Sequence, residues 1–317
     1  MPSSQKRRTT IGIALAVLAS IIWSGNFIIA RDVYREIPPI SLAFYRWLFA
    51  SVIILPFGIQ YLRREWETVK RSWLYLLLVA LSGIALFNTF IYVGAHHTSA
   101  INLALIGTTA SPIIATVMAR VFLKESIGWQ KLVGLALCIA GVLYLLCRGD
   151  IRQLLSLSFT RGDLWVLTAA FFFAMYNTLV KKKPTGISSM NFLLLAFTLG
   201  TLVLLPFYFW ERSTTLPVQW NAKLGWSIAY LSVGASVICF WIWNIAIARL
   251  GAARTILFGN LIPIFSTLGS VLILNERFTF IHLVSMLLVF SGILASNFPV
   301  RKDVNASAKA DVSRKNE

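Results

Sequence analysis

The sequence predicts an all-α polytopic membrane protein of ten transmembrane helices, arranged as two inverted five-helix repeats. Hydrophobic residues make up 57% of the 317 positions, charged residues only 13%, and the mean hydropathy is +0.74. A soluble domain carries roughly 25% charged residues. The apolar residues also fall into blocks of about 20, the length that a helix needs to cross a hydrocarbon core. The two halves of the chain, moreover, match each other at one constant offset.

The net charge of +17 does not indicate a nucleic-acid partner. The basic residues lie between the apolar blocks rather than on one soluble unit, so we interpret them as topology determinants. Cys138, Cys147 and Cys239 lie inside apolar stretches without metal-ligand spacing. We therefore expect small hydrophobic cysteines, with no metal, cofactor or disulfide.

Ten apolar segments define the expected spans, with short connections between them. They are 11–30, 39–61, 73–94, 99–123, 127–147, 164–181, 188–210, 224–248, 252–274 and 279–298. The corresponding organisation is a cytoplasmic N-terminus (1–10), a first five-helix repeat (11–147), a linker (148–163), a second, inverted repeat (164–298) and a cytoplasmic tail (299–317). Most Lys and Arg residues fall on the side of the N-terminus, so the positive-inside rule places both termini in the cytoplasm of a plasma (inner) membrane protein.

An internal repeat links the two halves. The segment GTTASPIIATVMARVFLKE (107–125) matches GNLIPIFSTLGSVLILNE (259–276), with Pro112 and Pro263 lying 151 positions apart. The same offset pairs Asn26 with Asn177, Gly83 with Gly234, and Gly141 with Gly292. Because each unit has five spans, the second copy starts on the other side of the membrane. Inverted repeats of this kind are common in transporters that alternate access around a midplane site.

On these motifs the chain resembles the drug/metabolite transporter superfamily, specifically its ten-helix EamA-type exporters, from about Ile11 to Pro299. The motifs are the element Thr98, Ser99, Ala100, a Pro followed 13 residues later by Glu125 or Glu276 in each half, and a Gly near the end of each half. The resemblance implies export of amino acids, related metabolites or drugs from a cavity lined by helices 1, 3, 4, 6, 8 and 9. The abundance of aromatic residues is most similar to the amino-acid exporters of the YddG type.

Pro112 and Pro263 each fall in the middle of a span. A proline there removes one backbone hydrogen bond and favours a kink, which is either static or a hinge that moves during transport. The nearby Ser111 is close enough to bond the freed carbonyl group.

Polar and aromatic residues deep in the spans are the candidates for substrate contact. Aromatic faces with a few amides can hold an apolar side chain and bind its polar end. The candidates are Trp23, Asn26, Arg46, Asn88, Tyr92, Ser111, Tyr176, Asn177, Trp243, Asn244 and Asn260. The alternative is structural, because Asn also bonds neighbouring helices and Trp and Tyr also form interfacial belts.

Arg46 lies about eight residues into the second span and has two interpretations. A charge at that depth suggests a functional role, such as binding a substrate carboxylate. Alternatively, its side chain extends along the helix to the outer headgroups. All acidic residues can be placed in loops, turns or tails, which argues against a proton relay and favours a neutral or zwitterionic substrate moving down its gradient.

These observations favour a carrier that exports amino acids with bulky apolar or aromatic side chains by alternating access. Carriers for nucleotide or sugar conjugates or for drugs are the alternative. A membrane-embedded lipid enzyme lacks an HExxH motif or a nucleophile with a nearby base, and an ion channel lacks a ring of charges. We therefore expect no catalytic residues. The expected partners are a small-molecule substrate and the lipid bilayer, and the sequence leaves the oligomeric state open.

Overall fold

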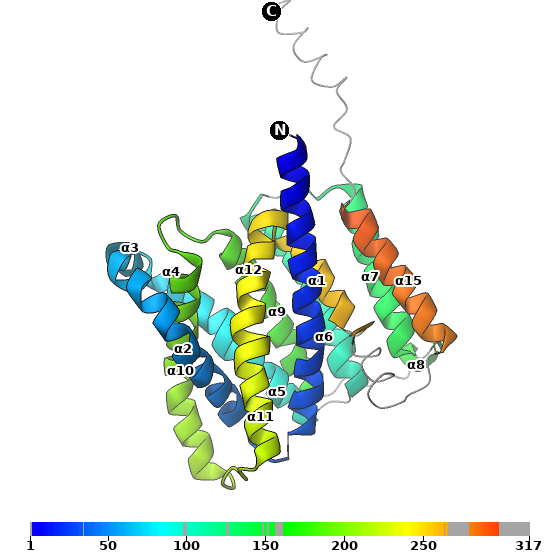
Figure 1. Ribbon diagram of the computed structural model, residues 1–317. Coiled ribbons are helices and arrows are strands. Elements are labelled where there is room, and N and C mark those ends of the chain that lie inside the picture. The colour runs from blue at the N-terminus through cyan, green and yellow to red at the C-terminus, as the bar shows by residue number, and fades with distance from the viewer. Residues whose placement is uncertain are drawn as a thin grey trace, which may run out of the picture.

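The computed structural model describes residues 2–33, 35–97, 100–124, 127–147, 149–150, 152–155, 161–262, 264–265 and 279–297. Every regular element in these ranges is a helix, and the long helices run side by side as one bundle (Figure 1). We call the face of the bundle at which α1 begins the N-terminal face, and the other the opposite face.

The first half of the chain and the linker after it contribute nine described elements. They are α1 (Pro2–Asp32), α2 (Pro39–Arg64), α3 (Trp66–Arg71), α4 (Trp73–Val79), η1 (Ala80–Leu86), α5 (Phe87–His97), α6 (Ala100–Phe122), α7 (Trp129–Leu146) and the short α8 (Arg152–Leu155). The second half begins with α9 (Arg161–Lys181) and continues with α10 (Ser189–Thr214), α11 (Ala222–Ser232), η2 (Val233–Ile238), α12 (Cys239–Leu250), α13 (Ala252–Leu257), η3 (Phe258–Asn260) and α15 (Phe280–Asn297).

The helices confirm the predicted membrane class. Within the described residues, six helical stretches are long and apolar enough to cross a membrane: Gln5–Asn26, Pro39–Arg64, Trp73–Gly94, Arg161–Lys181, Ser189–Thr214 and Ala222–Leu250. The helices α6, α7 and α15 occupy the predicted fourth, fifth and tenth spans and contain shorter apolar stretches. The predicted ninth span begins with α13 and η3. Most of its remainder lies outside the described residues, as do Pro263, Thr98, Ser99, Glu125 and Glu276.

Two spans differ from uniform α-helices. Between α4 and α5 the third span passes through η1, a π-helical segment, and between α11 and α12 the eighth span passes through η2, which is also π-helical. Gly83 in η1 and Gly234 in η2 are partners in the internal repeat. Segments of this type are found mostly at functional sites, because they redirect backbone carbonyl groups away from the helical ladder. Periodicity in the sequence does not distinguish them from an α-helix.

The packing of α7 against α15, the last helix of each half, shows how the halves are related. A Cβ added to Gly134 would lie 2.5 Å from the carbonyl oxygen of Gly292, and one added to Gly141 would lie 2.9 Å from that of Ser285. Gly134 and Ser285 are repeat equivalents, and so are Gly141 and Gly292. Each contact therefore has its reciprocal, as a two-fold axis between antiparallel helices requires. The five-helix units are inverted relative to each other.

A second antiparallel pair, α2 with α10, shows the same relation. The hydroxyl groups of Tyr45 and Tyr208 lie 2.8 Å apart, and those of Ser51 and Thr201 lie 3.3 Å apart. Since the residue number rises on one helix as it falls on the other, α2 and α10 run in opposite directions along their contact. These helices belong to the second span of each half.

Two carboxylates bind the ends of this pair. Glu211, at the end of α10, accepts hydrogen bonds from the Ser41 backbone N–H at 2.6 Å and from the Ser41 hydroxyl at 2.8 Å, at the start of α2. Glu65, just after α2, accepts from the Ser188 N–H at 2.9 Å and from the Asn191 amide at 2.7 Å, at the start of α10. Each anion lies at a helix N-terminus, where the helix dipole stabilises it. We call these two contacts the carboxylate clasps; one lies near each face.

The two antiparallel pairs form opposite edges of the bundle, and the remaining helices lie between them (Figure 1). In this centre α1 packs against α12, and α5 packs against α9. These contacts are also equivalent under the repeat, because they join the first span of one half to the third span of the other. The candidate substrate residues lie on the central helices and on the inner face of α2.

Candidate functional site

A buried arginine organises the centre of the bundle. Arg46 is only 1% exposed and lies seven residues into α2, about 10 Å from its start. Its guanidinium group donates hydrogen bonds to five oxygen atoms on α1, η2 and α5. The acceptors are Asn26 Oδ1 (2.9 Å) on α1, Ser236 Oγ (2.6 Å) and the Ala235 carbonyl oxygen (3.0 Å) on η2, and Asn88 Oδ1 (3.0 Å) and Tyr92 Oη (2.8 Å) on α5. We call these residues the Arg46 cluster.

Every acceptor in the Arg46 cluster is a neutral oxygen. Among the described residues no Asp or Glu pairs with the guanidinium group, so its positive charge is stabilised by neutral oxygen acceptors and by the ring of Trp47, whose centroid lies 4.8 Å from Arg46 Cζ. Ionisable residues inside a membrane protein are costly and by default mark a functional site. Since a charged acceptor forms a hydrogen bond roughly twice as strong as a neutral one, the cluster can receive an anionic group.

The π-helical segment η2 provides one of these acceptors. The N–H of Cys239 bonds the carbonyl groups of Gly234 and Ser236 and bypasses the carbonyl of Ala235. The Ala235 carbonyl group instead accepts from the guanidinium group of Arg46 and from the indole N–H of Trp23, at 2.8 Å. The irregular backbone therefore joins α1 and α2 to the eighth span.

An aromatic layer adjoins the Arg46 cluster toward the N-terminal face. The Trp23 ring centroid lies 4.9 Å from that of Trp243 and 5.7 Å from that of Phe240. The indole N–H of Trp243 donates to Asn177 Oδ1 at 2.8 Å, and the hydroxyl group of Tyr176 donates to Asn244 Oδ1 at 2.8 Å. The rings of Trp243 and Tyr176 are fully buried. This layer presents apolar ring faces with two amide groups at its edge.

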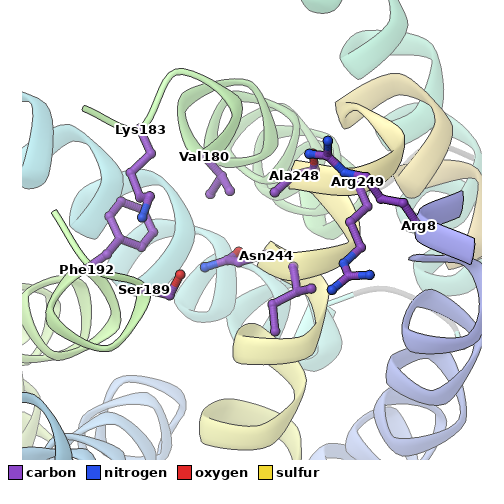
Figure 2. Close-up of a pocket in the computed structure, with 9 residues that line it drawn as sticks. Arg8, Val180, Lys183, Ser189, Phe192, Asn244, Ala248 and Arg249 are labelled. Atoms are coloured by element: carbon purple, nitrogen blue, oxygen red, sulfur yellow. The ribbon is translucent and has the colours of Figure 1, made fainter. Parts of the chain in front are cut away.

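A vestibule of about 340 Å³ extends from the N-terminal face toward this layer (Figure 2). Its volume is at the lower end of the range for small-molecule sites, roughly 300–1,000 Å³. The lining residues are Arg8, Val180, Lys183, Ser189, Phe192, Asn244, Ile245, Ala248 and Arg249. Asn244 is only 9% exposed, and its amide nitrogen has no hydrogen-bond partner within the described part of the chain. The vestibule thus ends beside a buried amide nitrogen that has no hydrogen-bond partner among the described residues.

Among the described residues that line the vestibule, three are cations and none is an acid. Arg8 donates to the Ala248 carbonyl group at 3.3 Å, and Lys183 donates to the Ile187 carbonyl group at 2.6 Å. Burial lowers the pKa of Lys183, and the charge of nearby Glu65 opposes that change. The guanidinium group of Arg249 has no hydrogen bond or ion pair with any described residue. Both arginines and Lys183 therefore contribute positive charge to this space.

The sequence model of the EamA-like transporter family matches residues 10–147 and again residues 160–298. The chain belongs to the EamA-like transporter family. This is a family of transporters and not of enzymes, and the two matched segments are the duplicated halves that the packing relates by a two-fold axis.

Relatives and a solved structure extend this likeness over almost the whole chain. An uncharacterized transporter of Archaeoglobus fulgidus is 27% identical over 279 residues, which cover 88% of this chain and 94% of that protein. A probable amino-acid metabolite efflux pump of Escherichia coli is 22% identical and covers 90% of this chain and 95% of its own. A crystal structure with a TM-score of 0.69 and 17% identity covers 92% of this chain and 96% of that one, and shares the fold.

In this EamA protein the structure brings most of the predicted site residues together. Trp23, Asn26, Arg46, Asn88, Tyr92, Tyr176, Asn177, Trp243 and Asn244 form the Arg46 cluster, the aromatic layer and the base of the vestibule. Two others bond elsewhere. Ser111 Oγ donates to the Ala170 carbonyl group of α9 at 3.4 Å, and the Asn260 amide donates to the Leu257 carbonyl group one turn back.

The predicted hinge is described in one half only. α6 is helical on both sides of Pro112, and the hydroxyl group of Thr116, one turn later, donates to the Pro112 carbonyl group at 2.8 Å. Ser111 bonds α9 rather than the carbonyl group left free by the proline. Pro263 lies outside the described residues, so the hinge remains a prediction.

The second interpretation of Arg46, extension to the outer headgroups, is wrong. Its side chain points inward, because the carbonyl and hydroxyl groups of η2 and α5 offer it more acceptors than the helix surface does. Sequence reasoning also missed Arg8, Lys183 and Arg249, which had been interpreted only as topology determinants. It missed Ser236 and Phe240 as well, since neither stands out from its apolar surroundings in the sequence.

Proposed function

We propose that this EamA transporter exports small zwitterionic metabolites from the cytoplasm, and that its substrates are amino acids with bulky apolar or aromatic side chains. Transport would proceed by alternating access, with the centre of the bundle open first to one face and then to the other. Two inverted halves favour this mechanism, because exchanging their conformations gives states of similar energy.

The observation that carries the substrate class is a buried guanidinium group beside an aromatic layer. Arg46 is a fixed cation surrounded by neutral acceptors, so a substrate carboxylate can replace one or more of them and form a charge-assisted bond. The rings of Trp23, Trp243 and Phe240 lie next to it and offer an apolar surface for a side chain. The name of the related Escherichia coli protein, a probable amino-acid metabolite efflux pump, agrees with this class.

The vestibule is compatible with the proposed direction of transport. It opens at the N-terminal face, which the positive-inside rule assigns to the cytoplasm in a plasma (inner) membrane. Among the described acids buried against helices, Asp163 lies in the first turn of α9 and Glu211 in the last turn of α10. Both lie at helix ends rather than in the centre, which supports transport down the substrate gradient without an intramembrane carboxylate relay.

The test is uptake of labelled amino acids into proteoliposomes. Trp243→Ala removes a fully buried ring of the aromatic layer, and we expect flux of aromatic amino acids to fall at least tenfold. Trp226→Ala is the matched control, since this indole is 78% exposed on the outside of the bundle, and it should retain flux. If no amino acid shows saturable flux with the unaltered protein, the substrate class is wrong. Flux that an uncoupler abolishes at a fixed substrate gradient would contradict the uncoupled mechanism.

The three cations of the vestibule favour a second candidate, a carrier of nucleotide or sugar conjugates. Such a substrate carries more negative charge than an amino acid and would use all three cations. Competition by nucleotide sugars that exceeds competition by amino acids would favour this candidate.

A further inference from the structure

We infer that the vestibule on the N-terminal face is a separate carboxylate-binding site, which selects the substrate before it reaches the Arg46 cluster. The site consists of Arg249, Arg8 and the Asn244 amide, with Lys183 at its rim. The inference deepens the proposed function and rests on it for the identity of the substrate, whereas binding in the vestibule can be measured without transport.

The geometry supplies donors that lack acceptors. The amide nitrogen of Asn244 is buried at the base of the vestibule, and its oxygen is already occupied by the hydroxyl group of Tyr176. The amide orientation is thereby fixed, and the nitrogen faces the cavity (Figure 2). A buried donor without a partner costs about 1–3 kcal/mol. A ligand oxygen at this position removes that cost.

The positive charge of the vestibule favours a carboxylate oxygen over a neutral oxygen at this position. Arg249 also lines the vestibule, on the side of α12 that faces α1, and its guanidinium group has no bonding partner in the described part of the chain. Arg8 adds a second guanidinium group from α1, while Glu65 compensates part of the charge of Lys183. A planar guanidinium group matches the geometry of a carboxylate. Topology alone requires these cations to be at this face but does not require them to line one cavity.

The vestibule and the Arg46 cluster together form two anion sites separated by the aromatic layer. A carboxylate would be held first by the donors and cations of the vestibule, while the amino-acid side chain faces Phe192 and Val180. It would pass to Arg46 when the aromatic layer rearranges. A neutral solute could bond the amide but would not gain the attraction of the cations, and a cationic solute would be repelled, so selection precedes the conformational change.

The charge of the vestibule can be measured from the rates at which anionic and cationic reagents modify a thiol placed in it. Ser189 lines the cavity across from Asn244, and the native residues Cys138, Cys147 and Cys239 are buried, so Ser189→Cys in the full chain offers one accessible thiol (Figure 2). We would measure its modification by the anionic sulfonatoethyl and the cationic trimethylammonium-ethyl methanethiosulfonate reagents, each normalised to its rate with a free thiol. The unaltered protein measures background, and Ala248→Cys serves if Ser189→Cys does not fold.

We expect the anionic reagent to react several-fold faster than the cationic one, and Arg249→Gln to remove most of that preference. Arg212→Gln, an exposed cation at the opposite face, should leave it unchanged. L-phenylalanine should slow the labelling, whereas L-phenylalaninamide, which lacks the carboxylate, should not. Equal rates for the two reagents, protection by the amide, or protection by inorganic phosphate without protection by phenylalanine would overturn the inference. A protein that shows charge selection but no flux would contradict the proposed function alone.

Discussion

At the scale of single residues, the central feature is a guanidinium group that the protein holds without a counter-charge. The five acceptors of Arg46 come from α1, η2 and α5, so this side chain joins the first and third spans of one half to the eighth span. Its repeat equivalent is Phe197, a fully buried ring that packs against Trp47 and Phe240. The cation is therefore specific to one half, and the proposed substrate site is polar on one side and apolar on the other.

Replacing this arginine by lysine tests whether the guanidinium group, rather than the charge, matters. Arg46→Lys keeps the charge but has three donors on one atom, which cannot reach acceptors spread around the guanidinium plane. We expect flux to fall at least tenfold and the thermal unfolding midpoint to fall as well. Arg64→Lys, at the exposed end of the same helix, is the control. Wild-type flux in Arg46→Lys would show that a point charge is sufficient.

The hydroxyl group of Tyr176 fixes the orientation of the Asn244 amide. Tyr176→Phe removes this donor from a buried pair and should cost about 1–3 kcal/mol of stability. It should also raise the KM for amino acids, because the amide at the base of the vestibule loses its fixed orientation. Tyr61→Phe provides a matched change at a residue near the end of α2. An unchanged KM would show that the orientation of the Asn244 amide does not matter for substrate binding.

At the scale of elements, the two π-helical segments are equivalent in sequence position but differ in their surroundings. A Cβ added to Gly83 in η1 would collide with the buried ring of Tyr176, whereas one added to Gly234 in η2 would first meet Ile22, at 3.5 Å. Both halves therefore keep the π-helical backbone, whereas the close contact between the glycine and an aromatic ring exists in the first half only.

The glycine pair gives an internal control. Gly83→Ala should destabilise the protein by about 1–3 kcal/mol, because overpacking against a fully buried ring forces the backbone or the ring to move. Gly234→Ala should be tolerated. Thermal unfolding of both variants in detergent checks this, and equal loss of stability in the two would show that the π-helical backbone itself, rather than the Tyr176 contact, requires glycine.

Most of the elements could be predicted from the sequence, since apolar blocks of membrane-spanning length are the strongest signal that a chain carries. The repeat offset also indicated the inversion. The π segments could not be predicted, because a single extra residue in a helical turn leaves the apolar pattern intact. The inward direction of Arg46 depends on the Ala235 carbonyl group, which only η2 makes available. The vestibule depends on cations that are far apart in the chain and already explained by topology.

At the scale of the whole molecule, the two antiparallel helix pairs at the edges are joined by the carboxylate clasps and by close backbone packing. The central helices are joined mainly by side-chain contacts in the Arg46 cluster and the aromatic layer. The carboxylate clasps fix both ends of α2 against α10, and close glycine contacts join α7 to α15. Movement between inward-open and outward-open states would therefore take place among the central helices.

Weakening a clasp should reduce stability at one face. Glu211→Gln replaces a charged acceptor that holds two N–H groups and a hydroxyl group of α2 and should cost about 1–3 kcal/mol. Glu67→Gln, a surface residue paired only with exposed Lys70, should have almost no effect. Chemical unfolding measures both, and an unaffected Glu211→Gln would show that packing alone holds the pair.

The most direct test of alternating access measures two equivalent distances at once. Ser189 and Ala248 flank the vestibule at the N-terminal face, and the repeat offset maps them onto Pro38 and His97 at the opposite face. Spin labels on each pair, followed by pulsed electron resonance with and without substrate, report both ends of the bundle. If access alternates, the Ser189–Ala248 distance shortens in the state in which the Pro38–His97 distance lengthens. Two distances that stay fixed, or that change in the same direction, would contradict it.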